Sequence, residues 1–172
     1  MDEFQLDLAD NQNMLAEILL FFAIQEPDQA RDLTMRARAA ADNAARIYGQ
    51  RKTASGREGL AQSLVWLALC EDQGTASAKR QAEAAEKCLE QLGPEQALSG
   101  NQLTLLAMAR SLQGQANASL GALMLAVQRG ENTAYRFEKH EKLAFKNLMD
   151  DATTAAAFRA QVAKVSKMLK LN

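Results

Sequence analysis

The stretch that decides the fold is SGNQLTLLAMARSLQGQANASLGALMLAVQRG, which spans residues 99–130. Ser99 is a residue type that favours a helix N-cap, and the apolar segment that follows it runs to Gly114. A second apolar segment then continues to Gly130, where another glycine ends it. Two helix-length segments with a short connection predict an antiparallel helical hairpin.

Gly, Asn, Thr and Pro divide the whole chain of 172 residues into helix-length segments in the same way. It is 48% hydrophobic and only 5% aromatic, with two prolines, so Ala, Leu, Val and Met must build most of the core. Runs of β-branched residues are absent, which leaves an all-β fold without support. We therefore predict an all-α protein. The expected helices cover about residues 11–25, 27–49, 57–73, 78–92, 103–113, 116–129, 133–148 and 152–169.

The first expected helix differs from the others because it is apolar nearly all round. Between Met14 and Ile24 only Glu17 and small residues interrupt the large apolar side chains. Such a helix needs cover on more than one side. The run is too short to span a bilayer, and the acidic N-terminus lacks the positive region of a signal peptide. We expect a cytoplasmic protein without a transmembrane segment.

Residues 103–131 resemble one tetratricopeptide repeat. Arg110 stands where that family usually has an aromatic residue, and Glu131 where it usually has proline. A second copy with a longer turn precedes it, so that the resemblance covers residues 60–131. The matching positions are Leu103, Leu106, Ala107, Gly114, Ser119, Leu123 and Ala126 in the first copy, and Leu64, Leu67, Ala68, Ala82 and Pro94 in the second.

The resemblance implies antiparallel helical hairpins stacked as a short tetratricopeptide-like superhelix. An irregular closed helical bundle is the alternative fold. We expect a single domain over residues 1–172, with an N-terminal hairpin in 1–56, two tetratricopeptide-like hairpins in 57–131 and C-terminal helices in 132–172.

The resemblance also implies that the first helix of each hairpin lines a partner-binding groove. Mostly apolar residues would form it: Val65, Trp66, Leu69, Asp72, Asn101, Thr104, Leu105, Met108, Ser111 and Leu112. Such a groove suits an apolar helix or peptide of another protein. The alternative is that these residues are core, covered by the chain's own first helix.

Catalytic, cofactor and metal sites are not expected. His140 is the only histidine, and no glycine-rich phosphate loop occurs. Cys70 and Cys88 fit no metal or redox spacing and are expected to be reduced thiols. A basic connector with Arg46, Arg51, Lys52 and Arg57 is a possible anion contact, although a solvated loop is the default interpretation.

The function expected from the sequence is thus a non-enzymatic protein–protein interaction module, either an adaptor or a chaperone. Charge segregation supports an alternative, a homo-oligomeric structural protein. Residues 1–30 carry seven acidic and no basic residues, whereas residues 136–172 carry eight basic and four acidic ones. Binding of nucleic acid through the basic connector is a weaker alternative, because the net charge is −1.

Overall fold

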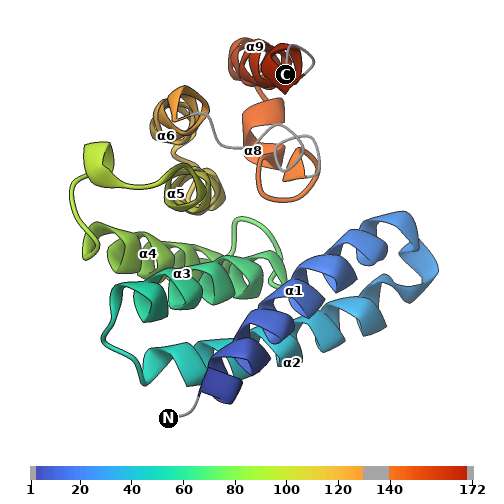
Figure 1. Cartoon of the computed structure of the whole chain (residues 1–172). Coiled ribbons are helices and arrows are strands. Elements are labelled where there is room, and N and C mark those ends of the chain that lie inside the picture. The colour runs from blue at the N-terminus through green and yellow to red at the C-terminus, as the bar shows by residue number, and fades with distance from the viewer. Residues whose placement is uncertain (1–2, 130–139, 170–172) are drawn as a thin grey trace. The chain divides into compact units, whose positions relative to one another are not determined.

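The computed structural model describes residues 3–129 and 140–169, with side chains up to residue 164. Within these residues the structure consists of eight α-helices and two short 3-10 helices, without strands (Figure 1). The prediction of an all-α protein built from helical hairpins is confirmed. The chain divides into two compact units, Met1–Leu92 and Gly93–Asn172. Each unit is described by itself.

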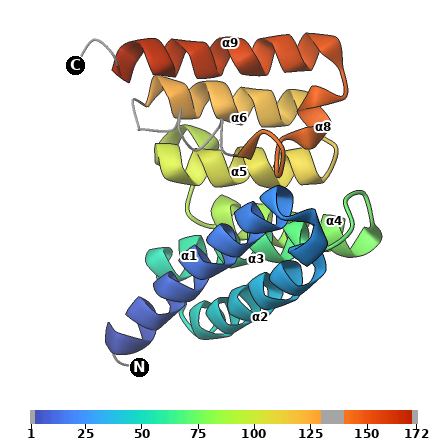
Figure 2. The ribbon, with the colours of Figure 1, turned by 90° about the vertical axis from the view of Figure 1, so that its right-hand side faces the viewer.

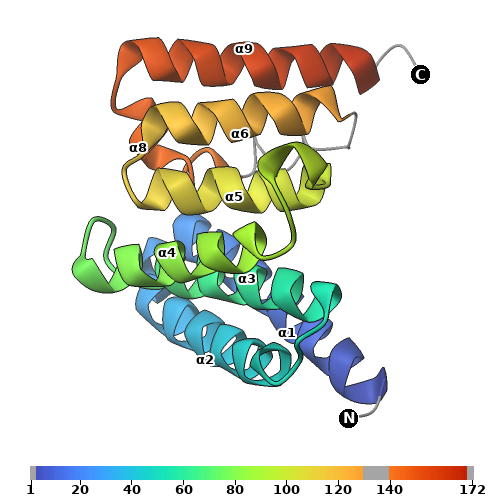
Figure 3. The ribbon, with the colours of Figure 1, turned by 90° about the vertical axis from the view of Figure 1, so that its left-hand side faces the viewer.

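Unit 1 holds four helices that form two hairpins. Helix α1 pairs with α2 through the 3-10 turn η1, and α3 pairs with α4; α2 also packs against α3, and α1 contacts α3 (Figures 1 and 3). Thus α2 and α3 are the two middle helices of unit 1. The bounds are α1 Glu3–Gln25, η1 Pro27–Gln29, α2 Ala30–Gly49, α3 Ala54–Leu69 and α4 Ala76–Glu90.

Two helices of unit 1 begin three or more residues earlier than predicted. Helix α1 starts at Glu3 instead of residue 11, because Leu6 and Ala9 continue the apolar spacing and pack against Tyr48. Helix α3 starts at Ala54 instead of residue 57, because the Thr53 side chain accepts a hydrogen bond from the Gly56 amide and caps the helix. The predicted loop over 50–56 is therefore wrong for its last three residues.

The buried side of unit 1 is made largely of small side chains. Helix α2 buries one side, which consists of Leu33, Ala37, Ala40, Ala41, Ala44 and Tyr48. Alanine stripes let helix backbones approach closely, and α4 buries a stripe of the same kind. In α4 these residues are Ala78, Ala82, Ala85 and Leu89.

A buried polar cluster joins α1 to α3. The Asn13 side-chain amide donates a hydrogen bond to the Gly59 carbonyl oxygen at 3.2 Å. The Ser63 hydroxyl lies 2.9 Å from both the Asn13 Oδ1 and the same carbonyl oxygen. Because buried polar groups are costly unless they are paired, this cluster favours one register of α1 on α3.

Unit 2 begins with the 3-10 turn η2 and the predicted hairpin. Ser99 caps α5 in a reciprocal capping box with Gln102, and Gly114 adopts a φ of 82° at the turn into α6. Helix α6 packs between α5 and α9, and α8 contacts α5 and α9 (Figure 2). The bounds are η2 Glu95–Ala97, α5 Gly100–Leu112, α6 Ala116–Gln128, α8 Lys146–Met149 and α9 Ala152–Leu169.

The segment between α6 and α9 differs from its prediction. A single helix over 133–148 was expected; residues 130–139 lie outside the described residues, and from Glu141 the chain forms turns and the four-residue helix α8. The Asn147 side chain donates to the Ser111 carbonyl oxygen at 2.7 Å, and the rings of Phe145 and Phe158 lie 5.1 Å apart. These contacts hold α8 against α5 and α9.

Candidate binding surface on helix α1

The residues predicted to line a groove are divided between the two units. In unit 1 Val65, Trp66 and Leu69 are buried, whereas Asp72 is exposed; in unit 2 only Asn101 retains partial exposure. The buried members of unit 2 are Thr104, Leu105, Met108, Ser111 and Leu112. The groove stays a prediction, but a charged residue at Leu105 or Met108 would disturb packing and could not serve as a test of binding.

The basic residues of the predicted anion contact lie around the short connection between α2 and α3. The exposed Arg46 donates to the Asn43 side chain at 2.7 Å, and the Thr53 hydroxyl that could have faced an anion caps α3 instead. Arg51 and Arg57 are half-buried, and Lys52 is exposed. The structure supplies no further feature that points to a bound anion.

Large exposed apolar side chains gather on one helix, α1. Apart from Met14, they are spaced alternately by four and three residues along it, with Asn11 as the one polar member of the series. Six of the eight large apolar residues that are exposed in the described part of the chain belong to α1. We call the following set the α1 stripe: Phe4, Leu8, Met14, Leu15, Ile18 and Phe22.

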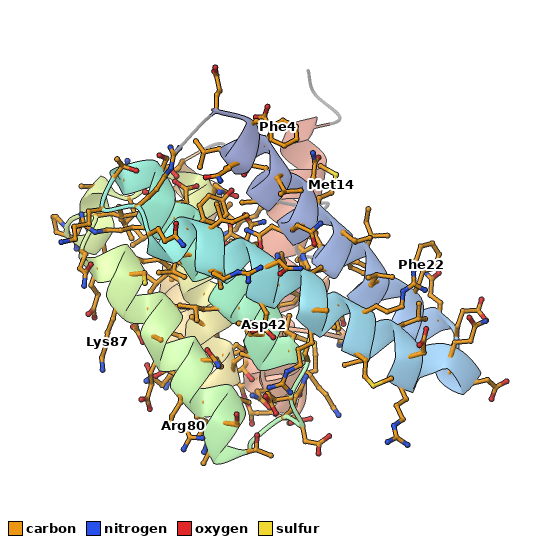
Figure 4. The ribbon with its side chains drawn as sticks, turned by 90° about the horizontal axis from the view of Figure 1, so that it is seen from below. Phe4, Met14, Phe22, Asp42, Arg80 and Lys87 are labelled. Atoms are coloured by element: carbon orange, nitrogen blue, oxygen red, sulfur yellow. The ribbon has the colours of Figure 1, made fainter. Side chains whose placement is uncertain are left out.

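The α1 stripe lies on the side of the helix that faces away from the core of unit 1. At about 100° per residue, the mean direction of Phe4, Leu8, Leu15, Ile18 and Phe22 is roughly 130° from that of the buried side chains. In Figure 4, Phe4, Met14 and Phe22 lie along the edge of α1 that is turned away from α2. The buried side consists of Ala9, Asn13, Ala16, Leu19 and Leu20.

The exposed fractions show that these are not isolated surface residues. Phe4 is 75% exposed, Met14 59% and Phe22 49%, over a helix of 23 residues. Single exposed apolar residues are normal on a protein surface, but a continuous stripe of this length marks an interaction site. The whole series follows the spacing with which helices pair through interlocking side chains.

Carboxylates border the α1 stripe. The exposed Glu3 and Asp7 belong to its first two turns, and Asp10 follows one turn later. The Asp10 carboxylate accepts a hydrogen bond from the phenol of Tyr48 on α2. Residues 3–30 contain no lysine or arginine, so the charged side chains of this helix are all acidic.

The sequence contained the signal for this surface, although the sequence analysis did not use it. The predicted need for cover on more than one side of α1 was based on its apolar content alone. The alternating spacing from Phe4 to Phe22 would have distinguished a second stripe from the one that packs on α2 and α3. The late predicted start at residue 11 had removed Phe4 and Leu8 from that pattern.

Other kinds of site find no support among the described residues. Histidine, cysteine, aspartate and glutamate side chains form no group of three that could hold a metal ion in residues 3–129 and 140–164. None of the helices in the described part of the chain combines the length and the apolar character needed to cross a bilayer. Cys70 and Cys88 are free thiols, and burial raises the pKa of both.

Comparison of the chain with protein-family models, with curated proteins and with solved structures finds no match in any of the three. The tetratricopeptide resemblance of residues 60–131 therefore stays a prediction. The seven matching positions in residues 103–126 are the turn glycine, Gly114, and six residues buried in the α5–α6 hairpin. In that hairpin the Ser119 hydroxyl donates to the Ala107 carbonyl oxygen at 2.7 Å.

Proposed function

We propose that this protein is a non-enzymatic protein–protein interaction module, an adaptor or a chaperone, that binds an amphipathic helix on the α1 stripe. The observation that carries the proposal is the coincidence of exposure and spacing on α1. Five large apolar residues between Phe4 and Phe22 are exposed and follow the four-and-three spacing of a helix-pairing seam.

The length of α1 suits a helical partner. A helix of 23 residues is about 34 Å long at 1.5 Å per residue, which is enough for a partner of five or six turns. The stripe begins and ends on an aromatic residue, Phe4 and Phe22. Aromatic anchors provide large contact areas, and they are enriched among the residues that dominate binding energy.

Burial of the α1 stripe supplies a driving force of suitable size. Full burial of one large apolar side chain contributes about 1.5–3 kcal/mol, and the stripe has six that are 40–75% exposed. The exposed parts add up to about three such side chains, or roughly 5–9 kcal/mol, and the apolar side of the partner adds a similar amount. Micromolar binding requires about 8 kcal/mol to remain after the cost of association. An affinity in that range suits an adaptor or a chaperone that must release its client.

A cytoplasmic location goes with this proposal, because Cys70 and Cys88 are free and the oxidising compartments favour disulfides. Self-association through the same stripe is the competing function, a homo-oligomeric structural protein. It differs in one measurable property, since only self-association makes the mass in solution depend on the α1 stripe.

The experiment combines a binding assay with a mass measurement. The probe is a labelled synthetic helix of three heptads with Leu at the a and d positions and Gln at e and g. We expect micromolar binding that the double variant Leu15→Ser/Ile18→Ser weakens at least tenfold, because both changes remove apolar contact area from the α1 stripe. The matched control is Met124→Ser, which removes an exposed apolar side chain from α6.

Three results decide between the functions. Binding that is lost in the double variant and kept in the control supports the helix-binding module. Equal binding by all three proteins places the probe elsewhere and overturns the proposal. A dimer in sedimentation velocity that becomes monomeric in the double variant would assign the stripe to self-association instead.

A further inference from the structure

We infer that the partner helix on the α1 stripe is basic, with Lys or Arg beside its apolar seam; this inference rests on the proposed function. The observation is the one-sided charge of the helix that carries the stripe. Within its described bounds α1 contains Glu3, Asp7, Asp10 and Glu17, and it contains no basic residue. Glu3 and Asp7 are exposed beside the stripe, so this surface would be apolar in the middle and acidic along one border.

The position of Asp7 is central to this argument. It lies three residues after Phe4 and four before Asn11, so helical periodicity places it in the row next to the stripe. Met14 occupies the same row one heptad later and is 59% exposed. A partner that buries Met14 therefore brings its own flanking residues close to the carboxylate of Asp7.

The carboxylates beside the α1 stripe disfavour three other occupants. Parallel pairing with a second copy would bring the Glu3 and Asp7 carboxylates of both helices together, and in either direction a second α1 supplies no lysine or arginine to pair with them. An anionic lipid surface and a nucleic acid are negatively charged, like the carboxylates beside the α1 stripe. A basic amphipathic helix is the occupant whose apolar and charged parts both match.

Asn11 supplies specificity within the same surface. It is the exposed polar member of the four-and-three series, between Leu8 and Leu15. A single asparagine in an otherwise apolar helix seam fixes the register of the paired helices, since its amide must find a polar partner. The preferred partner would thus carry one polar residue in the middle of its own apolar stripe.

The test uses three synthetic helices of three heptads that share Leu at the a and d positions. They differ only at e and g, which are Lys in one peptide, Gln in the second and Glu in the third. At 0.15 M salt we expect the Lys peptide to bind about tenfold tighter than the Gln peptide, since several exposed ion pairs each contribute a few-fold at most. The Glu peptide should bind weakest, and 0.5 M salt should reduce these differences.

Variants of the protein assign the effect to named carboxylates. Glu3→Gln/Asp7→Asn should weaken binding of the Lys peptide about fivefold and leave the Gln peptide unchanged. Glu83→Gln/Glu90→Gln, which removes two exposed carboxylates from α4, should change neither peptide. Leu15→Ser/Ile18→Ser should weaken all three, because the apolar contact is common to them.

The outcomes separate the inference from the function on which it rests. Equal binding of the three peptides, all lost in Leu15→Ser/Ile18→Ser, would overturn the basic partner and leave the helix-binding function intact. No binding of any peptide would overturn both. Binding of the Lys peptide that persists in Leu15→Ser/Ile18→Ser would also overturn the inference, because the contact would then be only electrostatic. A salt-resistant dimer that the Lys peptide cannot displace would assign the stripe to a second copy.

Discussion

The ring of Tyr48 occupies the space that a side chain at Gly59 would need. A Cβ atom at position 59 would lie 2.4 Å from ring carbons of Tyr48, closer than real Cβ atoms approach. Both residues are buried, and the hydroxyl of the same tyrosine donates to Asp10 on α1. Residues 10, 48 and 59 thus bring α1, α2 and α3 together at one point of unit 1.

We expect Gly59→Ala to destabilise unit 1 by about 1–3 kcal/mol. The added methyl group must displace a buried aromatic ring, and overpacking of this kind outweighs the gain in helix propensity from glycine to alanine. Denaturant unfolding followed by the fluorescence of Trp66, the only tryptophan, measures this change in unit 1. The control is Gly49→Ala at the end of α2, where an added Cβ atom would have no packing neighbour within 4 Å. A stability for Gly59→Ala equal to that of the control would contradict the close approach.

Asn13→Ala should lower the free energy of unfolding of unit 1 by about 1–3 kcal/mol. The change removes the donor to the Gly59 carbonyl oxygen and one of the two acceptors near the Ser63 hydroxyl. A double-mutant cycle with Ser63→Ala, read by Trp66 fluorescence, should give a coupling energy above about 0.5 kcal/mol. Additive effects of the two changes would show that the two side chains do not act as one cluster.

The buried faces of α2 and α4 were predictable because each helix has one apolar side. In α2 buried residues recur every three or four positions from Leu33 to Tyr48, and the charged residues of this span all lie between them. A single stripe can be buried in only one orientation, so the period alone identifies the core side. The same reasoning succeeded for Ala78 to Leu89 in α4.

The binding surface was not predictable to the same degree, for a physical reason. Helix α1 has two apolar stripes, and the period cannot decide which of them α2 and α3 will cover. In α5 the seven residues from Leu103 to Ala109 are all buried, so its period distinguishes no side at all. The predicted groove on α5 was derived from a resemblance, whereas tertiary packing decides which apolar residues remain exposed.

The Cys70 thiol should react slowly with alkylating reagents. Burial is the main cause that raises its pKa from 9 to about 12, and the nearby Arg38 lowers it only in part. At pH 8 the thiolate fraction is therefore about a thousandfold smaller than in the unfolded chain. We expect the iodoacetamide rate of a Cys88→Ala variant to rise about tenfold per pH unit from pH 7 to 10, without a plateau. A plateau near pH 9 would show an unperturbed thiol.

The same shift predicts how stability depends on pH. A pKa that is higher in the folded than in the unfolded protein stabilises the fold while the group is protonated in both states. The contribution of Cys70 is thus complete below pH 9 and declines as the pH rises from 9 toward 12. Cys70→Ala/Cys88→Ala should lose less stability than Cys88→Ala between pH 8 and 10, measured by urea unfolding. Equal losses in the two proteins would contradict the assignment.

Arg110 should be worth about 1–3 kcal/mol to unit 2, more than a surface ion pair. Its guanidinium lies 3.0 Å from Glu95 and donates to the Ala118 carbonyl oxygen, so it joins η2, α5 and α6. The side chains of Arg110 and Glu95 are only 16% and 27% exposed. Removal of the arginine therefore leaves a carboxylate that solvent compensates only in part.

The variant for this test is Arg110→Met, which keeps most of the aliphatic volume. Hydrogen exchange of the α5 and α6 amides reads unit 2 separately from unit 1, and we expect it to become about tenfold to a hundredfold faster. The control is Arg159→Met, whose arginine is 67% exposed and 3.6 Å from Glu141, with an expected change below about 0.5 kcal/mol. Equal effects of the two variants would mean that Arg110 acts as an ordinary surface residue. In that case the arginine at the position where tetratricopeptide repeats carry an aromatic residue would have no structural role in joining α5 to α6.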